Sequence, residues 1–287
     1  MPSLIDLRRR IRSVKNTQQI TKAMKMVSTA RLRRAQDMVL SARPYAKMLR
    51  RILENVAAAA RDDEEAASNP LLAQRPENRI LILVMTGDRG LAGAFNSSVT
   101  KTVQKFIAEH PGAHVELELM GRKGRDFFRK RWPNISGEYS TLFLRTVKLD
   151  EALTIARKAI ERFRTAEVDA VYLIGNEFKS IASQIVSTTR LLPVEVPSTD
   201  ERIDYIYEEP PAQLLASLLP RYVETSVYSA MLESSASEHA ARMRAMDAAS
   251  SNAADVIERY TMTLNRVRQA SITKEIIEIV SGAAALG

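Results

Sequence analysis

The chain of 287 residues contains no cysteine, only three histidines, and few aromatic residues. Without cysteine it has no disulfide, no thiol nucleophile and no finger-type zinc site, and its composition fits a reducing compartment. The histidines (His110, His114 and His239) are too scattered for a metal site, and no nucleophile, base and orienting group can be assembled from the sequence. The sequence therefore indicates no active site, no metal site and no cofactor.

Long apolar runs are also missing. Nowhere do 18 apolar residues follow one another, and the N-terminus has no apolar segment of signal-peptide length. We therefore expect a chain that is neither exported by such a signal nor threaded through a membrane. Contact with a membrane through other proteins remains compatible with this composition.

Glycine and proline are absent from two long stretches, residues 221–281 and residues 3–43. Since these residues break helices most often, both stretches are predicted to be helical. At about 1.5 Å per residue the C-terminal helix would run about 90 Å, far beyond the span of a small domain. It therefore needs a partner helix and must extend beyond its own globular domain.

Heptad spacing supports this pairing, because apolar or small residues alternate in steps of three and four along both stretches. The C-terminal positions are Met243, Met246, Ser250, Ala253, Ile257, Tyr260, Leu264, Val267 and Ser271. The N-terminal positions are Leu4, Leu7, Ile11, Val14, Gln18 and Thr21, which we expect Met24, Val27 and Ala30 to continue. Ser3 and Asp6 occupy predicted N-cap and N3 positions. Pro44 is expected to kink this helix or to start a new one.

Between the helices the pattern changes to strands alternating with helices, which predicts an α/β layer with a mostly parallel sheet. Expected strands are 80–85, 114–121, 139–145 and 168–175, with edge strands in LPVEVPS and in 203–209. We expect one helix after each of the first two strands, one at 149–165, and one from 175 to about 186. The predicted domains are a helix at 1–60, a linker at 61–78, an α/β domain at 79–209 and a helix at 210–287.

Two motifs have competing interpretations. The Gly-rich turn GDRGLAG (87–93) could present backbone N–H groups to a phosphate, but it has neither dinucleotide-fingerprint nor P-loop spacing, so a structural βα turn is favoured. A nucleotide-binding enzyme stays open as an alternative. The acidic DDEE run (62–65) could bind a cation, although such a run is more often a solvated loop.

The net charge of +8 is concentrated at the N-terminus. Residues 1–51 hold 14 Lys and Arg against two Asp, a balance of +12, so the remaining chain carries −4. A basic helix of this kind could bind nucleic acid or an acidic protein surface, or form a solvated face of a coiled coil. No aromatic interleaving or nucleic-acid-binding signature accompanies it.

Both ends of the chain resemble one family. NTQQITKAMKMVSTARLRRAQ (16–36) and LNRVRQASITKEIIEIVSGAAAL (264–286) are similar to the γ subunit of F-type ATP synthases, as are TGDRGLAGAFNSSV and RYVETSVYSAMLESSASEHAARMRAM. The resemblance implies a long antiparallel coiled coil with an inserted Rossmann-like α/β domain. It implies a non-catalytic central rotor shaft that couples proton-driven c-ring rotation to ATP synthesis.

The resemblance also implies partners and contact residues. The partners are the α, β and ε (delta-type) subunits and the c-ring. Nucleic acid is not among them, and the chain contacts the membrane only through the c-ring. Arg268 and Gln269 resemble the pair that meets the β catch loop. Residues facing the acidic levers of β are Met24, Lys25, Arg8, Arg9 and Arg12. Residues resembling the foot on the c-ring are Tyr205, Tyr207 and Glu208. The absence of cysteine excludes the thiol control of the chloroplast version and favours a bacterial enzyme, at the cytoplasmic face of the inner membrane.

Overall fold

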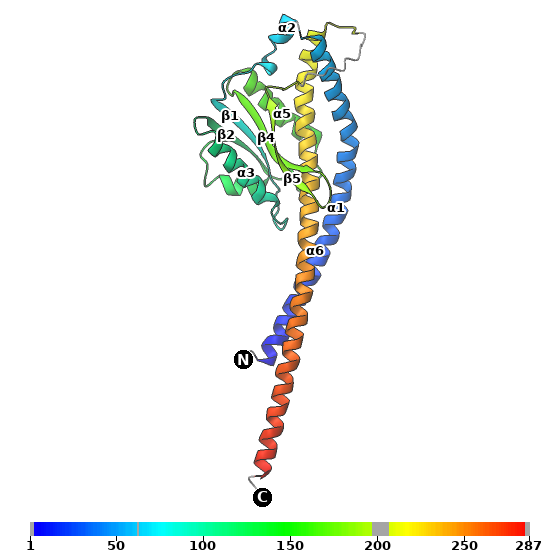
Figure 1. The fold of residues 1–287 in the computed structure, drawn as a ribbon, viewed down its shortest axis with the longest axis vertical. Helices are drawn as coiled ribbons and strands as arrows, with labels where there is room; N and C mark the ends of the chain where they lie inside the picture. The colour runs from blue at the N-terminus through cyan, green and yellow to red at the C-terminus, as the bar shows by residue number, and fades with distance from the viewer. Residues whose placement is uncertain (1–2, 62, 197–206, 285–287) are drawn as a thin grey trace. The chain divides into compact units, whose positions relative to one another are not determined.

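The computed structural model describes residues 3–61, 63–196 and 207–284. The chain forms two compact units, which we call the helical unit (residues 1–28 and 242–287) and the α/β unit (residues 29–241). Two helices continue through both units, α1 (Leu4–Ala59) and α6 (Pro211–Ala284) (Figure 1). The predicted pair of long terminal helices is confirmed.

The N-terminus of α1 is capped as the sequence predicts. The Asp6 amide donates to the Ser3 hydroxyl at 3.1 Å, and that hydroxyl donates to the Asp6 carboxylate at 2.9 Å. This satisfies one of the free N–H groups of the first turn and places a negative charge there. No second helix starts at Pro44, because α1 continues through it. Pro44 and Leu40 are both exposed, so water can reach the carbonyl group that the proline leaves without a donor.

The heptad seam of α1 is confirmed up to Thr21, but its continuation was wrong. Val27 is 55% exposed and Ala30 is exposed as well. After the step of three from Gln18 to Thr21, strict alternation requires a step of four to Lys25 and then Ser28. Ser28 is buried and Lys25 is half-buried. The seam therefore passes through polar residues that a search for apolar side chains overlooks.

The two helices run antiparallel in each unit. In the helical unit, Thr21 of α1 contacts Ser250 of α6, and Lys25 pairs with Asp247. In the α/β unit, Arg43 pairs with Glu233 at 3.3 Å and also donates to the carbonyl of Phe178 at the end of a strand. Residue numbers rise along α1 as they fall along α6, which confirms the antiparallel coiled coil.

A five-stranded sheet in the order β3-β2-β1-β4-β5 forms the centre of the α/β unit (Figure 1). The strands are β1 (Arg79–Met85), β2 (His114–Met120), β3 (Ile135–Tyr139), β4 (Ala170–Phe178) and β5 (Gln184–Leu192). The first four are parallel, and β5 is antiparallel to β4. The helices that alternate with them are α3 (Phe95–Glu109), α4 (Arg122–Phe128) and α5 (Leu149–Arg164). The predicted Rossmann-like layer is confirmed.

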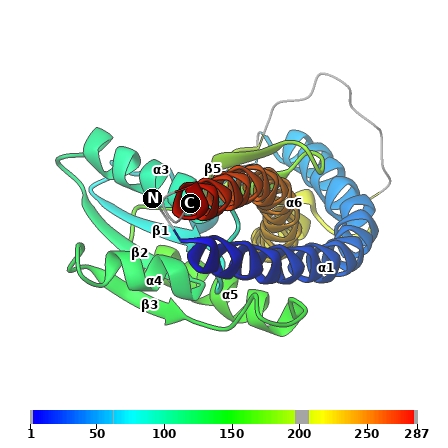
Figure 2. The ribbon, with the colours of Figure 1, turned by 90° about the horizontal axis from the view of Figure 1, so that it is seen from below.

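The central strand β1 is buried on both faces, because successive side chains point to opposite sides. Ile80, Ile82 and Val84 pack with residues of α3 and α4, which follow β1 and β2 along the chain. Figure 2 shows α3, α4 and α5 beside the strands of the sheet. On the opposite face α5 approaches β2, where Lys158 lies 2.6 Å from the fully buried carboxylate of Glu118. This ion pair joins α5 to the sheet.

The strand predicted at 139–145 was wrong in position. The strand β3 ends at Tyr139, and residues 140–145 form turns. Thr141 has a φ of 82°, and the amides of Thr141 and Phe143 both donate to the carboxylate of Asp88. A side chain far away in sequence therefore uses the N–H groups that a strand would have paired.

The helix predicted from 175 to 186 was also wrong. In its place β4 continues to Phe178, and a hairpin leads into β5. The β-branched residues of β5 (Ile185, Val186, Thr188 and Thr189) favour a strand, and pairing with β4 provides the tertiary context. The edge strand expected in LPVEVPS (192–198) was wrong over its described part, because β5 ends at Leu192 and residues 193–196 form no strand. Residues 207–209 form no strand either, and residues 197–198 and 203–206 lie outside the described residues.

The segment expected to be a surface linker contains short ordered elements, α2 (Glu64–Ala67) and a 3-10 turn, η1 (Pro70–Leu72). Asp63 caps α2 by accepting from the amides of Glu65 and Ala66. Ala66 and Leu71 are buried, so the segment is anchored to the α/β unit. The domain boundaries at 60, 78 and 209 stay a prediction.

Candidate partner-contact surfaces

The predicted arginines of α1 lie on the surface of the helical unit. Arg8, Arg9 and Arg12 are all exposed, and Arg9 alone has a nearby acid, with Asp6 at 3.4 Å. Among the described residues, Arg8 and Arg12 have no ion-pair partner. Three exposed guanidinium groups within about one helical turn produce a positive surface that suits an acidic partner.

Met24 and Lys25 occupy a different position from these arginines. Met24 is half-buried, and the Lys25 ammonium lies 2.6 Å from the Asp247 carboxylate of α6. Both members of this pair remain partly in solvent, so it contributes about 1 kcal/mol or less to stability. Lys25 therefore connects the two helices of the helical unit, and it keeps 42% of its side chain exposed.

Polar groups replace apolar packing next to this pair. The hydroxyl groups of Thr21 and Ser250 are buried and lie 2.7 Å apart. The side-chain amide nitrogen of Gln18 donates to the backbone carbonyl of Ser250 at 3.3 Å. A buried polar contact in a coiled-coil seam favours one register, because a shift along the helix leaves its groups unpaired. The seam is therefore specified by hydrogen bonds as much as by volume.

Arg268 and Gln269 are both exposed on α6, as a partner-contact role requires. Up to Ser271 the predicted seam residues of α6 are buried or half-buried. From residue 272 to residue 281, which we call the tail, every residue is exposed. The change takes place within one helical turn of Arg268 and Gln269.

The tail is apolar despite its exposure. Its large exposed side chains are Ile272, Ile276, Ile277, Ile279 and Val280, with exposed fractions from 48% to 71%. Exposed apolar clusters of this kind mark interaction surfaces. From the sequence we predicted no partner-contact residue beyond Gln269, although the isoleucine-rich run ITKEIIEIV continues after the seam has ended. That run is the sequence pattern from which this exposed apolar surface could have been predicted.

The predicted foot is only partly described. Tyr205 lies outside the described residues, Tyr207 is half-buried, and Glu208 is exposed just before α6 begins. The structure thus leaves Glu208 accessible at the start of the helix.

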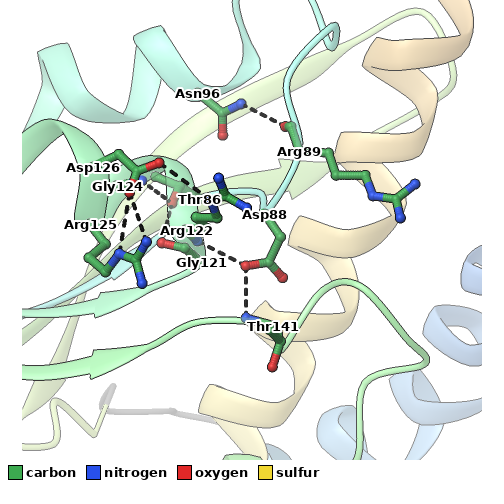
Figure 3. A network of polar contacts seen from close by, with 10 residues as sticks. All are labelled: Thr86, Asp88, Arg89, Asn96, Gly121, Arg122, Gly124, Arg125, Asp126 and Thr141. Carbon is green, nitrogen blue, oxygen red and sulfur yellow. Dashed lines mark hydrogen bonds and ion pairs between the residues drawn. The ribbon is translucent and has the colours of Figure 1, made fainter.

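The Gly-rich turn after β1 forms an internal hydrogen-bond network (Figure 3). One oxygen of the Asp88 carboxylate accepts from the amides of Arg122 and Thr141, both at 2.9 Å, and the other accepts from the Phe143 amide at 2.8 Å. The side chain of Asn96 accepts from the Gly87 amide. The turn therefore joins β1, α4 and the segment after β3, as a structural βα turn does.

Glycine is required at one position beside this network and is closely packed at another. A Cβ on Gly121 would lie 1.9 Å from the carbonyl oxygen of Thr86, and its φ of 97° strains any other residue. A Cβ on Gly87 would lie 2.7 Å from the carboxyl carbon of Glu238, which is 3% exposed. The Glu238 side chain of α6 thus fills the space at the edge of the sheet beside β1, where open α/β folds commonly bind ligands. This favours the structural interpretation of GDRGLAG over nucleotide binding.

Within the described part of the chain, no helix is both long and apolar enough to span a bilayer. Within the same residues, no group of three or more His, Asp or Glu side chains has a geometry that could hold a metal ion.

Comparisons with known proteins agree over the full length. The family model described as ATP synthase matches residues 3–286. The ATP synthase gamma chain of Solibacter usitatus (strain Ellin6076) is 62% identical, over 99% of this chain and 99% of that protein. The gamma chain of Pelotomaculum thermopropionicum is 48% identical over the whole of both chains. These matches do not support the nucleic-acid alternative.

Solved structures show the same fold. A chain of the central stalk and c-ring of Tetrahymena thermophila mitochondrial ATP synthase matches with a TM-score of 0.63 and 27% identity, over 80% of this chain and 99% of that one. A chain of the Euglena gracilis mitochondrial ATP synthase matches with a TM-score of 0.66 and 19% identity, over 99% of this chain. The second likeness shows the fold alone. From the family match and the full-length identities, the chain belongs to the ATP synthase gamma-chain family.

Proposed function

We propose that this chain is the central rotor shaft of a bacterial ATP synthase. It couples proton-driven rotation of a c-ring to ATP synthesis in a hexamer of α and β subunits. The chain itself is the non-catalytic part, and the catalytic groups belong to β. The full-length relatives named as gamma chains and the central-stalk structure support this role. We expect it at the cytoplasmic face of the inner membrane, attached only through the c-ring.

The observation that carries the proposal is the change of environment along α6. Its seam residues are buried or half-buried as far as Ser271, and then residues 272–281 expose five large apolar side chains. A helix end of this composition requires an apolar sleeve supplied by other chains. The α and β subunits provide that sleeve in our proposal, and Arg268 and Gln269 contact β at its entrance.

The second proposed contact, with the acidic levers of β, rests on charge. The exposed Arg8, Arg9 and Arg12, together with Met24 and Lys25, face the acidic levers of β in the proposal. Complementary charge fixes register and speeds association more than it adds affinity. Tyr207 and Glu208, with Tyr205, form the contact with the c-ring.

Energy transfer explains why the shaft is a long helical pair. Moving one charge through about 100 mV yields about 2.3 kcal/mol, so several steps must be stored before ATP is released. Two helices joined through the polar seam can hold that twist without local unfolding. The near absence of Gly and Pro from α1 and α6 gives them the required stiffness.

Assembly tests the proposal. The full chain is mixed with matched α and β subunits, and the product is analysed by native mass spectrometry and ATPase assay. We expect one copy of this chain per complex and cooperative ATP hydrolysis. Failure to assemble with matched subunits would contradict the role.

A pair of variants then tests the contact residues. Arg268→Ala is expected to weaken coupling or assembly by about tenfold, the loss of one charge-assisted contact. Arg61→Ala, an exposed change just after α1, is the control and should leave both unchanged. Equal effects of the two variants would show that Arg268 makes no such contact.

A further inference from the structure

A cavity in the α/β unit is lined by none of the predicted partner-contact residues. Its volume is about 250 Å³, and three elements line it: α1, the connection between β3 and α5, and α6. Arg31 and Arg34 come from α1, Arg145 from the connection, and Ser235 and His239 from α6. We call this cavity the arginine pocket.

Positive charge is concentrated in the arginine pocket without an acid to balance it. No lining residue is Asp or Glu, and over the described ranges 3–61, 63–196 and 207–284 the side chains of the three arginines have no ion pair or hydrogen bond with another residue. Arg31 is half-buried, and Arg34 and Arg145 are exposed. Guanidinium groups that face one cavity repel each other, and a concave site with weakly polar walls strengthens their field. Such a site attracts an anion.

The remaining lining supplies hydrogen bonding and a rigid frame. Ser235 is 7% exposed and carries a hydroxyl group, while Ala35, Leu232 and Val147 form an apolar floor. Arg145 follows the turn whose Thr141 and Phe143 amides are held by the Asp88 carboxylate. Its backbone position is therefore fixed by the same network that shapes the Gly-rich turn.

The chemistry of the donors indicates the kind of anion. Arginine presents planar pairs of N–H donors that match two oxygens of a phosphate, and it is always charged. A volume of about 250 Å³ lies below the range of about 300–1,000 Å³ typical of sites for larger organic ligands. Size therefore favours a compact oxyanion over a whole nucleotide.

We propose that the arginine pocket binds a compact, multiply charged oxyanion of the phosphate class, such as inorganic phosphate or diphosphate. The bound anion bridges α1, α6 and the connection that carries Arg145, and it stabilises the α/β unit by binding the folded state. The proposal does not depend on the rotor role, so each can fail without the other.

The test measures binding of inorganic phosphate to the full chain by isothermal titration calorimetry at constant ionic strength. We expect one site per chain and a rise in the thermal unfolding midpoint with phosphate. Arg34→Gln and Arg145→Gln should each raise the dissociation constant about tenfold or more, because each removes a charge-assisted contact. Circular dichroism establishes that the variants fold.

Arg33→Gln is the matched control. Arg33 is exposed on the same helix, next to Arg34 in sequence, but it does not line the pocket. Its loss removes the same net charge, so it reports diffuse attraction alone. Equal weakening by Arg33→Gln, equal displacement by chloride, or no saturable binding in the wild-type chain would overturn the proposal.

Three further ligands distinguish the source of the phosphate group. Diphosphate should bind at least as tightly as phosphate, and sulfate should compete with both. ADP should bind no tighter than diphosphate, because the nucleoside would extend out of a cavity of about 250 Å³ and gain few contacts there. ADP binding that is tenfold tighter than diphosphate, and that is lost in Arg145→Gln, would contradict a pocket for a compact anion.

Discussion

Two segments of the same helix differ in where their side chains find contacts. In α6, residues 231–240 are buried on every side apart from the half-buried Glu233, and many are small: Ser234, Ser235, Ala236, Ser237 and Ala240. Residues 272–281 are exposed on every side, yet they carry large isoleucines. Size and polarity are thus opposite to what burial within one chain would select.

This difference shows that the two segments are adapted to different surroundings. Residues 231–240 have neighbours from their own chain on all sides, so close approach requires small side chains. The tail has apolar side chains that its own chain does not cover, so its packing partner belongs to other chains in our proposal. Variants in the first segment should therefore affect folding, and variants in the tail should affect assembly.

The largest contrast is expected between Met231→Ala and Ile276→Ala. Met231 is fully buried, and its truncation leaves a cavity, which costs about 2–5 kcal/mol in the free energy of unfolding. Ile276 is 55% exposed, so its truncation should change that energy by about 0.5 kcal/mol or less. Urea denaturation of the isolated chain measures both. Similar losses would mean that the tail packs within its own chain.

A smaller effect is expected where α6 meets the Gly-rich turn. In Gly87→Ala the new methyl group lies 2.7 Å from the carboxyl carbon of Glu238, and the buried side chain must move. Overpacking of this kind costs about 1–3 kcal/mol. Gly112→Ala is the control, because a Cβ there meets nothing within 4 Å. If thermal unfolding midpoints of the two variants agree, Glu238 is not closely packed there.

The polar seam of the helical unit should contribute less to the free energy of unfolding than the packing of Met231 or the packing around Gly87. Ser250→Ala removes the hydroxyl that lies 2.7 Å from Thr21, at a cost of about 1 kcal/mol. Ser251→Ala is the control, since Ser251 is exposed and the two substitutions raise helix propensity equally. Amide hydrogen exchange around Thr21 should be faster in Ser250→Ala alone. Equal exchange in both variants would show that the hydroxyl pair does not stabilise the seam.

The contrast along α6 also explains which features the sequence could predict. Heptad spacing and the lack of Gly and Pro identified both long helices, because these signals are local. The polar seam positions Lys25 and Ser28 were missed, because their burial depends on a partner more than 200 residues away in sequence. The turn at 140–145 was missed for a similar reason, since Asp88 fixes it from a distance.

Site prediction followed the same division. Arg268, Gln269 and the basic residues of α1 were predicted by resemblance and stay a prediction. The exposure of Arg268, Gln269 and the three arginines of α1 is compatible with contact roles. The arginine pocket could not be predicted, since it combines α1, α6 and a connection whose positions only the fold defines. The β5 strand was missed because we expected a helix up to about residue 186, although the β-branched residues of β5 favour a strand, which pairs with β4.

The smallest predicted effect concerns pH and lies in the sheet, away from α6. The side chain of Asp169, 7% exposed, accepts hydrogen bonds from the side chain and amide of Arg79, which lower the pKa of that carboxyl below its usual value. Since the pKa is lower in the folded state, this contribution is complete above the unfolded pKa of about 3.9 and is lost as pH falls through the folded value. The Arg79 side chain is half-exposed, so solvent screens the pair and keeps the effect small.

Asp169→Asn should therefore be less stable than the wild-type chain near neutral pH, and the difference should narrow below about pH 4. Urea midpoints measured from about pH 6 to about pH 2 test this, with Asp255→Asn on the exposed surface of α6 as the control. Because Asp169 is buried in the α/β unit, only its variant should change the slope of stability with pH. Parallel curves for wild type and Asp169→Asn would mean that the carboxylate gains nothing from Arg79 on folding.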